Sequence, residues 1–104
     1  MKRIHFIDFD LIREWANDKN LLDACPKAQM LKLTEEVGEL AAAIARGKLA
    51  EAEDAIGDIV VVLTILACQL EGLDIEQCIE GTYDTIKERT GKLVDGVFIK
   101  DGEK

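Results

Sequence analysis

The chain has 104 residues, of which 48% are hydrophobic and only 5% are aromatic, and its formal net charge at pH 7 is −8. A domain of this size has room for one modest core, which must be built mainly from Leu, Ile, Val and Ala. So negative a charge argues against nucleic-acid binding, which needs a basic surface. We therefore expect a single domain over residues 1–104 with no nucleic-acid partner.

The cysteines and the hydropathy pattern indicate a cytoplasmic protein. The three cysteines, Cys25, Cys68 and Cys78, are odd in number and have no metal-ligand spacing. We expect the last two to be small core residues in a reducing compartment. The N-terminus lacks the apolar segment of a secretion signal. The longest apolar run, Ile59 to Cys68, is too short to span a bilayer, so we expect no membrane partner.

The first predicted helix follows an N-cap at Asp8 or Asp10 and ends near Asn17. Its apolar face carries Leu11, Ile12 and Trp15. Trp15 is compatible with two roles, stacking on a nucleobase or packing in the core, and the apolar face favours the core.

The second predicted helix runs from about Pro26, which suits a first helical turn, to about Arg46. Gly47 is its expected C-cap. Apolar residues recur at helical spacing and predict a core-facing stripe. This stripe consists of Met30, Leu33, Val37, Leu40, Ala41 and Ile44.

The third predicted helix runs from about Leu49 to Glu71 and is followed by Gly72. Between Ile59 and Cys68 it is apolar on every side, which is typical of a buried helix. Three short amphipathic neighbours cannot cover such a helix. We therefore expect an all-α bundle of about four helices per chain, completed by homo-oligomerisation as a homodimer or homotetramer.

The fourth predicted helix begins after Asp74, which forms a capping box with Gln77, and ends at Gly91. Its apolar stripe consists of Ile75, Cys78, Ile79, Thr82 and Ile86. The segment from Val94 to Val97 contains the Asp-Gly pair of a two-residue β-hairpin turn. We therefore expect a short hairpin after the last helix.

Two acidic clusters flank the turn at Gly47. The first contains Glu35, Glu36 and Glu39, and the second contains Asp54 and Asp58, with Glu51 one turn earlier. In an antiparallel helix pair, residues equally distant from the turn lie at equal height. Glu39 should therefore face Asp54, and Glu36 should face Asp58.

Four carboxylates at two matching levels suit a hard divalent cation, which takes oxygen ligands. The alternative is a solvated acidic face, the usual fate of a charge run. The second cluster runs directly into the apolar segment that starts at Ile59, and carboxylates beside a buried segment are costly unless paired or metal-bound. This position favours the metal site.

Three basic residues, Lys87, Arg89 and Lys92, lie where the fourth helix is expected to end. Basic residues suit a helix C-terminus because they interact favourably with the helix dipole. They also suit a phosphate clamp, in which arginine supplies a bidentate fork and lysine a point charge. Helix geometry alone does not favour either interpretation.

The ordered motifs resemble one known family. The segment Glu35 to Leu40 and the segment Asp54 to Asp58 resemble the EExxE and second acidic motifs of the MazG-like, all-α nucleotide pyrophosphohydrolases. The stretches Ile86 to Lys92 and Gly96 to Lys100 are similar to the C-terminal region of small phage and bacterial members. The resemblance covers about residues 7–100.

The resemblance implies hydrolysis of a nucleoside triphosphate between its α and β phosphates, which gives a monophosphate and pyrophosphate. It implies Mg²⁺, with Mn²⁺ as a substitute, held by Glu36, Glu39, Asp58 and Asp54. Glu35 would hold a second metal or orient the attacking water, which makes Glu35, Glu36, Glu39 and Asp58 the catalytic set. Lys87, Arg89 and Lys92 would bind the phosphates, and Trp15 is the candidate base contact.

One position departs from the family pattern. The second motif is usually ExxD, but Ala55 stands where the glutamate is expected, and Asp54 is the nearest substitute on that helix face. This departure keeps a second hypothesis open, a catalytically degenerate module that binds metal or nucleotide. A di-iron bundle ranks lower because it needs Glu-x-x-His pairs, and the sole histidine, His5, lies outside both acidic motifs. A purely structural oligomer is the remaining alternative.

Overall fold

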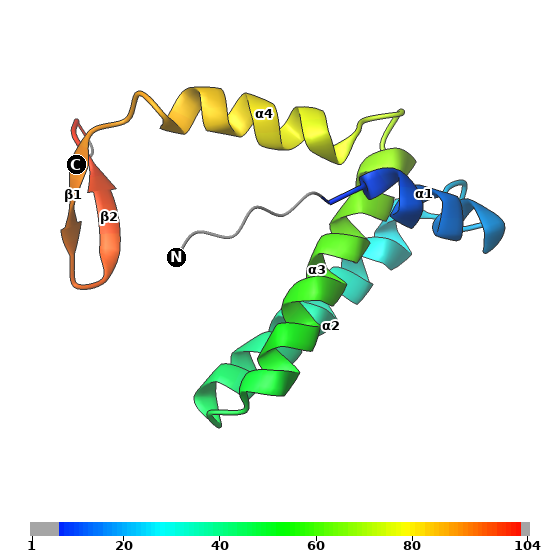
Figure 1. The fold of residues 1–104 in the computed structure, drawn as a ribbon, viewed down its shortest axis with the longest axis horizontal. Coiled ribbons are helices and arrows are strands. Elements are labelled where there is room, and N and C mark those ends of the chain that lie inside the picture. The colour runs from blue at the N-terminus through cyan, green and yellow to red at the C-terminus, as the bar shows by residue number, and fades with distance from the viewer. Residues whose placement is uncertain (1–6, 103–104) are drawn as a thin grey trace.

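The computed structural model describes residues 7–102, which form four helices followed by a two-stranded antiparallel sheet (Figure 1). The helices are α1 (Phe9–Asp18), α2 (Pro26–Ala45), α3 (Leu49–Gln69) and α4 (Ile75–Ile86), and the strands are β1 (Gly91–Val94) and β2 (Val97–Lys100). The mostly helical prediction is confirmed, with the small sheet added to it. The sole histidine, His5, lies outside the described residues.

The centre of the fold is an antiparallel hairpin of α2 and α3 (Figure 1). Gly47 adopts the left-handed conformation, with a φ of +67°, directly after α2. The amide of Lys48 donates to the carbonyl of Ala43 at 2.9 Å, which closes the end of α2 as a C-terminal cap. This reversal folds α3 back along α2 and sets the heights at which their side chains meet.

Small residues form most of the core. The buried apolar residues are Ala16, Ala43, Ala52, Ala55, Val62, Ile65 and Ala67. Alanine lets two helix backbones approach closely, which explains why α2 and α3 pack along their length. Ala16 of α1 is completely buried, and α1 packs across α3. Buried Thr64 satisfies its hydroxyl by donating to the carbonyl of Val60 at 2.7 Å.

Much of the predicted core stripe of α2 is exposed in the single chain. Met30 is 49% exposed, Val37 is 50% exposed and Ile44 is 66% exposed. Ile56 and Val60 of α3 are also exposed, although this helix contributes most of the core. One chain therefore does not cover the apolar faces of its own hairpin.

Helix α4 begins as predicted and ends earlier than predicted. The Asp74 carboxylate accepts from the amide of Gln77 at 2.7 Å and caps the first turn. The helix ends at Ile86, so the prediction that it continues to Gly91 is wrong. Gly91 instead opens β1, where a Cβ would collide with the carbonyl of Ile99 and the ring of Phe98. The prediction that Cys78 is a core residue is also wrong, since it is exposed.

The predicted hairpin turn is confirmed. Val94 pairs with Val97, and both residues between them have positive φ angles, 49° for Asp95 and 78° for Gly96. This is the geometry of a two-residue turn that matches the twist of antiparallel strands. Within residues 7–102, none of the helices is both long and apolar enough to cross a membrane.

Candidate functional site

The α2–α3 hairpin brings the two acidic clusters together. Glu39 and Asp54 line one cavity, and Glu36 and Asp58 line a second one. Glu36 and Asp58 each lie eleven positions from Gly47, and Glu39 and Asp54 lie eight and seven positions from it. We call Glu36, Glu39, Asp54 and Asp58 the carboxylate cluster.

Glu36 is the most deeply placed member of the cluster. It is 3% exposed, and its Oε1 lies 3.1 Å from Nζ of Lys32 one turn earlier on α2. Its other oxygen, Oε2, is buried and has no hydrogen-bond partner among the described residues. A buried carboxylate oxygen without a partner is costly, so this atom has an unmet requirement for a donor or a cation.

The charges of the cluster act on one another. The negative charge of Glu36 is the largest cause that raises the pKa of Glu39 above its usual range, and partial burial adds to it. Burial is the largest cause that raises the pKa of Asp58, followed by the charges of Asp54 and Glu36. Helices α2 and α3 therefore hold like charges close enough to oppose ionisation, which a bound cation would relieve.

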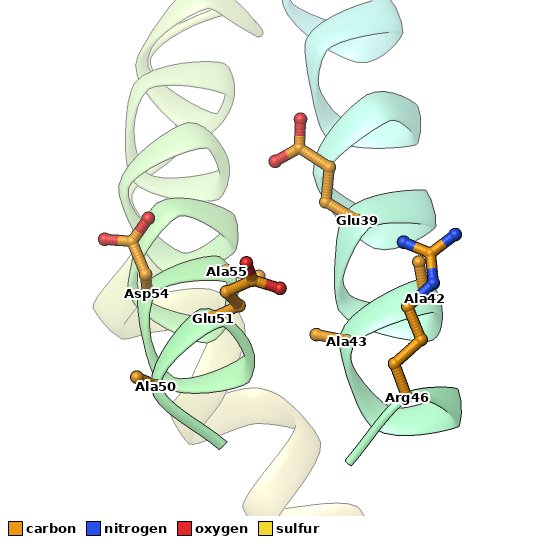
Figure 2. Close-up of a pocket in the computed structure, with 8 residues that line it drawn as sticks. All are labelled: Glu39, Ala42, Ala43, Arg46, Ala50, Glu51, Asp54 and Ala55. Atoms are coloured by element: carbon orange, nitrogen blue, oxygen red, sulfur yellow. The ribbon is translucent and has the colours of Figure 1, made fainter. Parts of the chain in front are cut away.

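A cavity of about 470 Å³ opens between the helices near the turn. Figure 2 shows the carboxylates of Glu39 and Glu51 extending from opposite helices toward the space between α2 and α3. Asp54 and Arg46 also line this cavity, and its remaining walls are the small side chains of Ala42, Ala43, Ala50 and Ala55. The absence of a longer side chain at position 55 contributes to the open space.

A second cavity, of about 500 Å³, adjoins the deep end of the carboxylate cluster. Glu36 and Asp58 form one wall, and the rest is mostly apolar, with Val61, Val62, Ile65 and Leu21 among its residues. Trp15 also lines it and is 51% exposed, so the interpretation of Trp15 as a core residue is wrong. A mostly apolar cavity with a few charged groups on one wall has the character of a small-molecule site.

The predicted phosphate-binding residues lie far from the carboxylate cluster in the single chain. Lys87 caps the end of α4 and forms an ion pair with Asp84 at 3.2 Å, and Lys92 belongs to β1. Figure 1 shows α4 and the sheet extending away from the α2–α3 hairpin. Glu35 remains on α2 beside Glu36 and is exposed, with its charge contributing to the raised pKa of Lys32.

The residues fit a divalent cation only after some rearrangement. Within residues 7–102, no three His, Cys, Asp or Glu side chains already converge as a formed metal-binding group. The unpartnered Oε2 of Glu36 and the repulsion at Glu39 and Asp58 nevertheless supply a negative, partly buried donor set.

Two basic residues at the site were not predicted as functional. Hydrogen bonding to Glu36 raises the pKa of Lys32, which also lines the apolar cavity. Arg46 lines the cavity near the turn. Lys32 lies one turn before the first acidic motif and Arg46 is the C-cap residue of α2, and at both positions a basic residue has the pattern of an ordinary surface charge. The sequence signal that could have identified them is their distance from the first acidic motif: Lys32 lies four residues before Glu36, and Arg46 lies seven residues after Glu39.

Comparison with protein-family models shows the family to which the chain belongs. Residues 25–94 match the model of the MazG nucleotide pyrophosphohydrolase domain, which is more than half of the chain. The chain belongs to the MazG family. The match spans both acidic motifs and ends at the close of β1, so it includes the whole α2–α3 hairpin and α4.

One curated relative is similar to part of the chain. The chain is 48% identical over 59 residues to an uncharacterized 18.2 kDa protein from the rep-hol intergenic region of Haemophilus phage HP1. The alignment covers 56% of this chain and 36% of that relative, so the chain corresponds to only about a third of the relative's length. No solved structure matches the chain.

Proposed function

We propose that this protein is a Mg²⁺-dependent nucleoside triphosphate pyrophosphohydrolase of the nucleotide pool. It would convert an NTP or dNTP to the monophosphate and pyrophosphate in the cytoplasm. The observation that carries the proposal is buried Glu36, whose Oε2 has no partner among residues 7–102 and whose charge acts on Glu39 of the same helix and on Asp58 of α3. The MazG match supplies the reaction class.

The carboxylate cluster would hold the metal. Glu36, Glu39, Asp54 and Asp58 are hard oxygen donors, which Mg²⁺ prefers and Mn²⁺ also accepts. The bound ion would neutralise charge on the phosphate oxygens and favour attack by water. As the cation binds Glu36, it would displace Lys32 from its ion pair with that carboxylate. Lys32 lines the apolar cavity, so its ammonium would then contact the substrate.

The remaining residues would position the substrate. Glu35, on the exposed side of α2 next to Glu36, would accept a hydrogen bond from the attacking water and orient it. Trp15 would cover the nucleobase in the apolar cavity, because an aromatic face stacks on any base. Lys87, Arg89 and Lys92 would bind the leaving pyrophosphate.

The protein would act as a homo-oligomer. The exposed apolar residues of α2 and α3, among them Val37, Ile44 and Ile56, are the surface that a second copy would cover. Burying them against a second copy would complete the bundle, as a homodimer or homotetramer. Sedimentation of the purified protein tests this part of the proposal.

Purified protein with Mg²⁺ and a panel of NTPs and dNTPs tests the function. Free phosphate is measured with and without added inorganic pyrophosphatase, beside a Glu39→Ala variant. Cleavage between the α and β phosphates predicts a signal only when pyrophosphatase is added, and its loss in the variant. Phosphate released without pyrophosphatase would indicate a different bond and overturn the proposal.

Ala55 favours one second candidate, a module that binds Mg²⁺ or nucleotide without turnover. The side chain at this buried position has no carboxylate, where the family pattern has a glutamate. Folded protein that binds Mg²⁺ but leaves every nucleotide in the panel intact would support this candidate over the enzyme.

A further inference from the structure

The two cavities lie on opposite sides of the carboxylate cluster along the α2–α3 hairpin. In α2, residues 25–36 contribute to the apolar cavity and residues 39–46 to the cavity near the turn. In α3, residues 58–65 contribute to the apolar cavity and residues 50–55 to the cavity near the turn. A ligand held at the carboxylate cluster can therefore extend in two directions, and these directions differ in chemistry.

The cavity near the turn suits a charged group better than an aromatic one. Besides four alanines, the residues that line it are all charged: Glu39, Arg46, Glu51 and Asp54. The apolar cavity instead has Trp15, Leu21 and Val61 among its residues. A nucleoside triphosphate joins an aromatic base to a charged polyphosphate, so only one orientation matches both cavities. Its base would lie in the apolar cavity and its terminal phosphates toward the turn.

Arg46 is the only basic residue among the described residues that line the cavity near the turn. It follows Glu39 by seven residues, which places it about 10 Å closer to the turn and within about 20° of the same helix face. Figure 2 shows its side chain running back along α2 beside Ala42. This is the direction in which helical side chains lean. The guanidinium therefore lies nearer to the level of the carboxylate cluster than its own backbone does.

The guanidinium of Arg46 is not used by the fold. Within residues 7–102 it forms no ion pair and donates no side-chain hydrogen bond. Lys48, which lines a different cavity, does pair with Glu51, at 3.9 Å. Because Arg46 is exposed and arginine has five N–H donors, the whole guanidinium fork is open to a ligand in the cavity.

We propose that Arg46 binds the leaving pyrophosphate and thereby fixes the direction in which the nucleotide lies. This inference rests on the proposed function, because it assigns the β and γ phosphates of that reaction to the cavity near the turn. The planar fork of arginine can donate to two phosphate oxygens at once. The carboxylates of the cavity would repel bare pyrophosphate, so it binds there as its magnesium complex. Lys87, Arg89 and Lys92 line neither cavity, so Arg46 is the basic residue that the hairpin itself supplies at this end of the site.

The assignment also selects the substrate class. A nucleoside diphosphate places one phosphate beyond the α–β bond, and a monophosphate places none. Only a triphosphate offers two phosphates to the guanidinium of Arg46. The protein should therefore favour triphosphates over diphosphates, and this preference should shrink when the guanidinium is removed.

Calorimetric titration of magnesium pyrophosphate tests the binding without turnover. Arg46→Gln should weaken it by about tenfold or more through the loss of charge-assisted hydrogen bonds. Lys48→Gln is the matched control, since it removes the same charge near the same turn from a side chain outside this cavity, and it should change the affinity by less than about twofold. Deoxynucleoside monophosphates should bind both variants as they bind wild type.

Three results of this titration would overturn the proposal. Wild type that does not bind magnesium pyrophosphate would remove the site. Equal losses in the Arg46 and Lys48 variants would reduce the effect to net charge. A lower unfolding midpoint of Arg46→Gln with unchanged pyrophosphate affinity would show that the arginine serves only the end of α2.

Steady-state kinetics separates this inference from the proposed function. Arg46→Gln should raise KM for the triphosphate and weaken product inhibition by pyrophosphate, with inhibition by the monophosphate unchanged. Arg46→Lys should lie between, because lysine keeps the charge and loses the fork. Wild-type kinetics in Arg46→Gln would overturn the role of Arg46 and leave the proposed function intact. Wild type that binds magnesium pyrophosphate through Arg46 but cleaves no nucleotide would refute the proposed function and support the binding site.

Discussion

Nζ of Lys32 lies 3.1 Å from Oε1 of Glu36, while Oε2 of the same buried carboxylate has no hydrogen-bond partner among the described residues. The lysine thus meets only half of what a buried carboxylate requires. Glu36 and Asp58 line the same cavity. If the protein binds a divalent cation as proposed, this asymmetry makes Glu36 the residue on which binding should depend most.

Replacing Glu36 with glutamine should abolish stabilisation by Mg²⁺. Wild-type protein should gain several degrees in its unfolding midpoint as Mg²⁺ saturates the site, because a ligand that binds only the folded state stabilises it. The Glu36→Gln variant should show no gain. Differential scanning fluorimetry with increasing Mg²⁺ measures both, and Glu14→Gln on the exposed face of α1 is the matched control. An equal gain in the Glu36 variant would remove this residue from the metal site.

Replacing Lys32 with glutamine should have opposite effects on folding and on metal binding. Without its partner, Glu36 is a buried, unpaired charge, so the free protein should unfold at a lower temperature. Loss of a competing cation should tighten Mg²⁺ binding by roughly threefold to tenfold. Calorimetric titration of Mg²⁺ gives the affinity. Weaker binding in the variant would show that Lys32 is needed to position the carboxylate.

The stability of the metal-free protein should fall with increasing pH because of Glu39 and Asp58. Both have a pKa that is raised in the folded state, from ordinary values of 4.5 and 3.8. A raised pKa favours folding below the ordinary value, and this contribution is lost as pH rises through the folded value. In EDTA, Glu39→Gln should match wild type near pH 4 and unfold at a higher temperature near pH 7. A variant that is less stable at pH 7 would contradict charge repulsion at this position.

The pair of Arg13 and Glu76 should have the reverse pH dependence. Hydrogen bonding to Arg13 lowers the pKa of Glu76 in the folded state. This contribution to stability is therefore present above the ordinary value of 4.5 and is lost as pH falls through the lowered value. Glu76→Gln should lower the unfolding midpoint by a few degrees at pH 7 and by less at pH 3. A loss that is the same at both pH values would show that the ion pair does not stabilise the contact between α1 and the first turn of α4.

Ala55→Glu should strengthen the metal site. Position 55 lines the same cavity as Glu39 and Asp54, and the cavity of about 470 Å³ has room for a longer side chain. A fifth carboxylate should tighten Mg²⁺ binding by about tenfold and make Asp54→Asn less harmful than it is in wild type. Calorimetry on the two single variants and the double variant measures this. Unchanged affinity would show that Asp54 already fills the role of the missing glutamate.

Local signals in the sequence predicted the element boundaries that depend on neighbouring residues alone. Asp74 caps α4 through the amide of Gln77, Gly47 ends α2, and the pair of Asp95 and Gly96 forms the turn. Each of these depends on a conformation or hydrogen bond within a few residues. The end of α4 was mispredicted because the requirement for glycine at Gly91 comes from Ile99 and Phe98 on the neighbouring strand.

The pairing of acidic residues was predictable because it follows from symmetry about the turn. Glu36 and Asp58 needed only helical periodicity and the position of Gly47. The burial of individual side chains was not predictable in the same way. Trp15 and Val37 lie on apolar stripes, but whether a stripe is covered depends on how many helices surround it, and a single chain does not supply enough of them.

The most direct test of the central claim is product analysis in heavy-oxygen water. Wild-type protein with Mg²⁺ and its best substrate is predicted to release nucleoside monophosphate and pyrophosphate in equal amounts, with the heavy oxygen in one of the two. Glu36→Gln should release neither product. A nucleoside diphosphate with free phosphate, or unchanged turnover in the Glu36 variant, would contradict the assignment of this carboxylate cluster as the site of α–β cleavage.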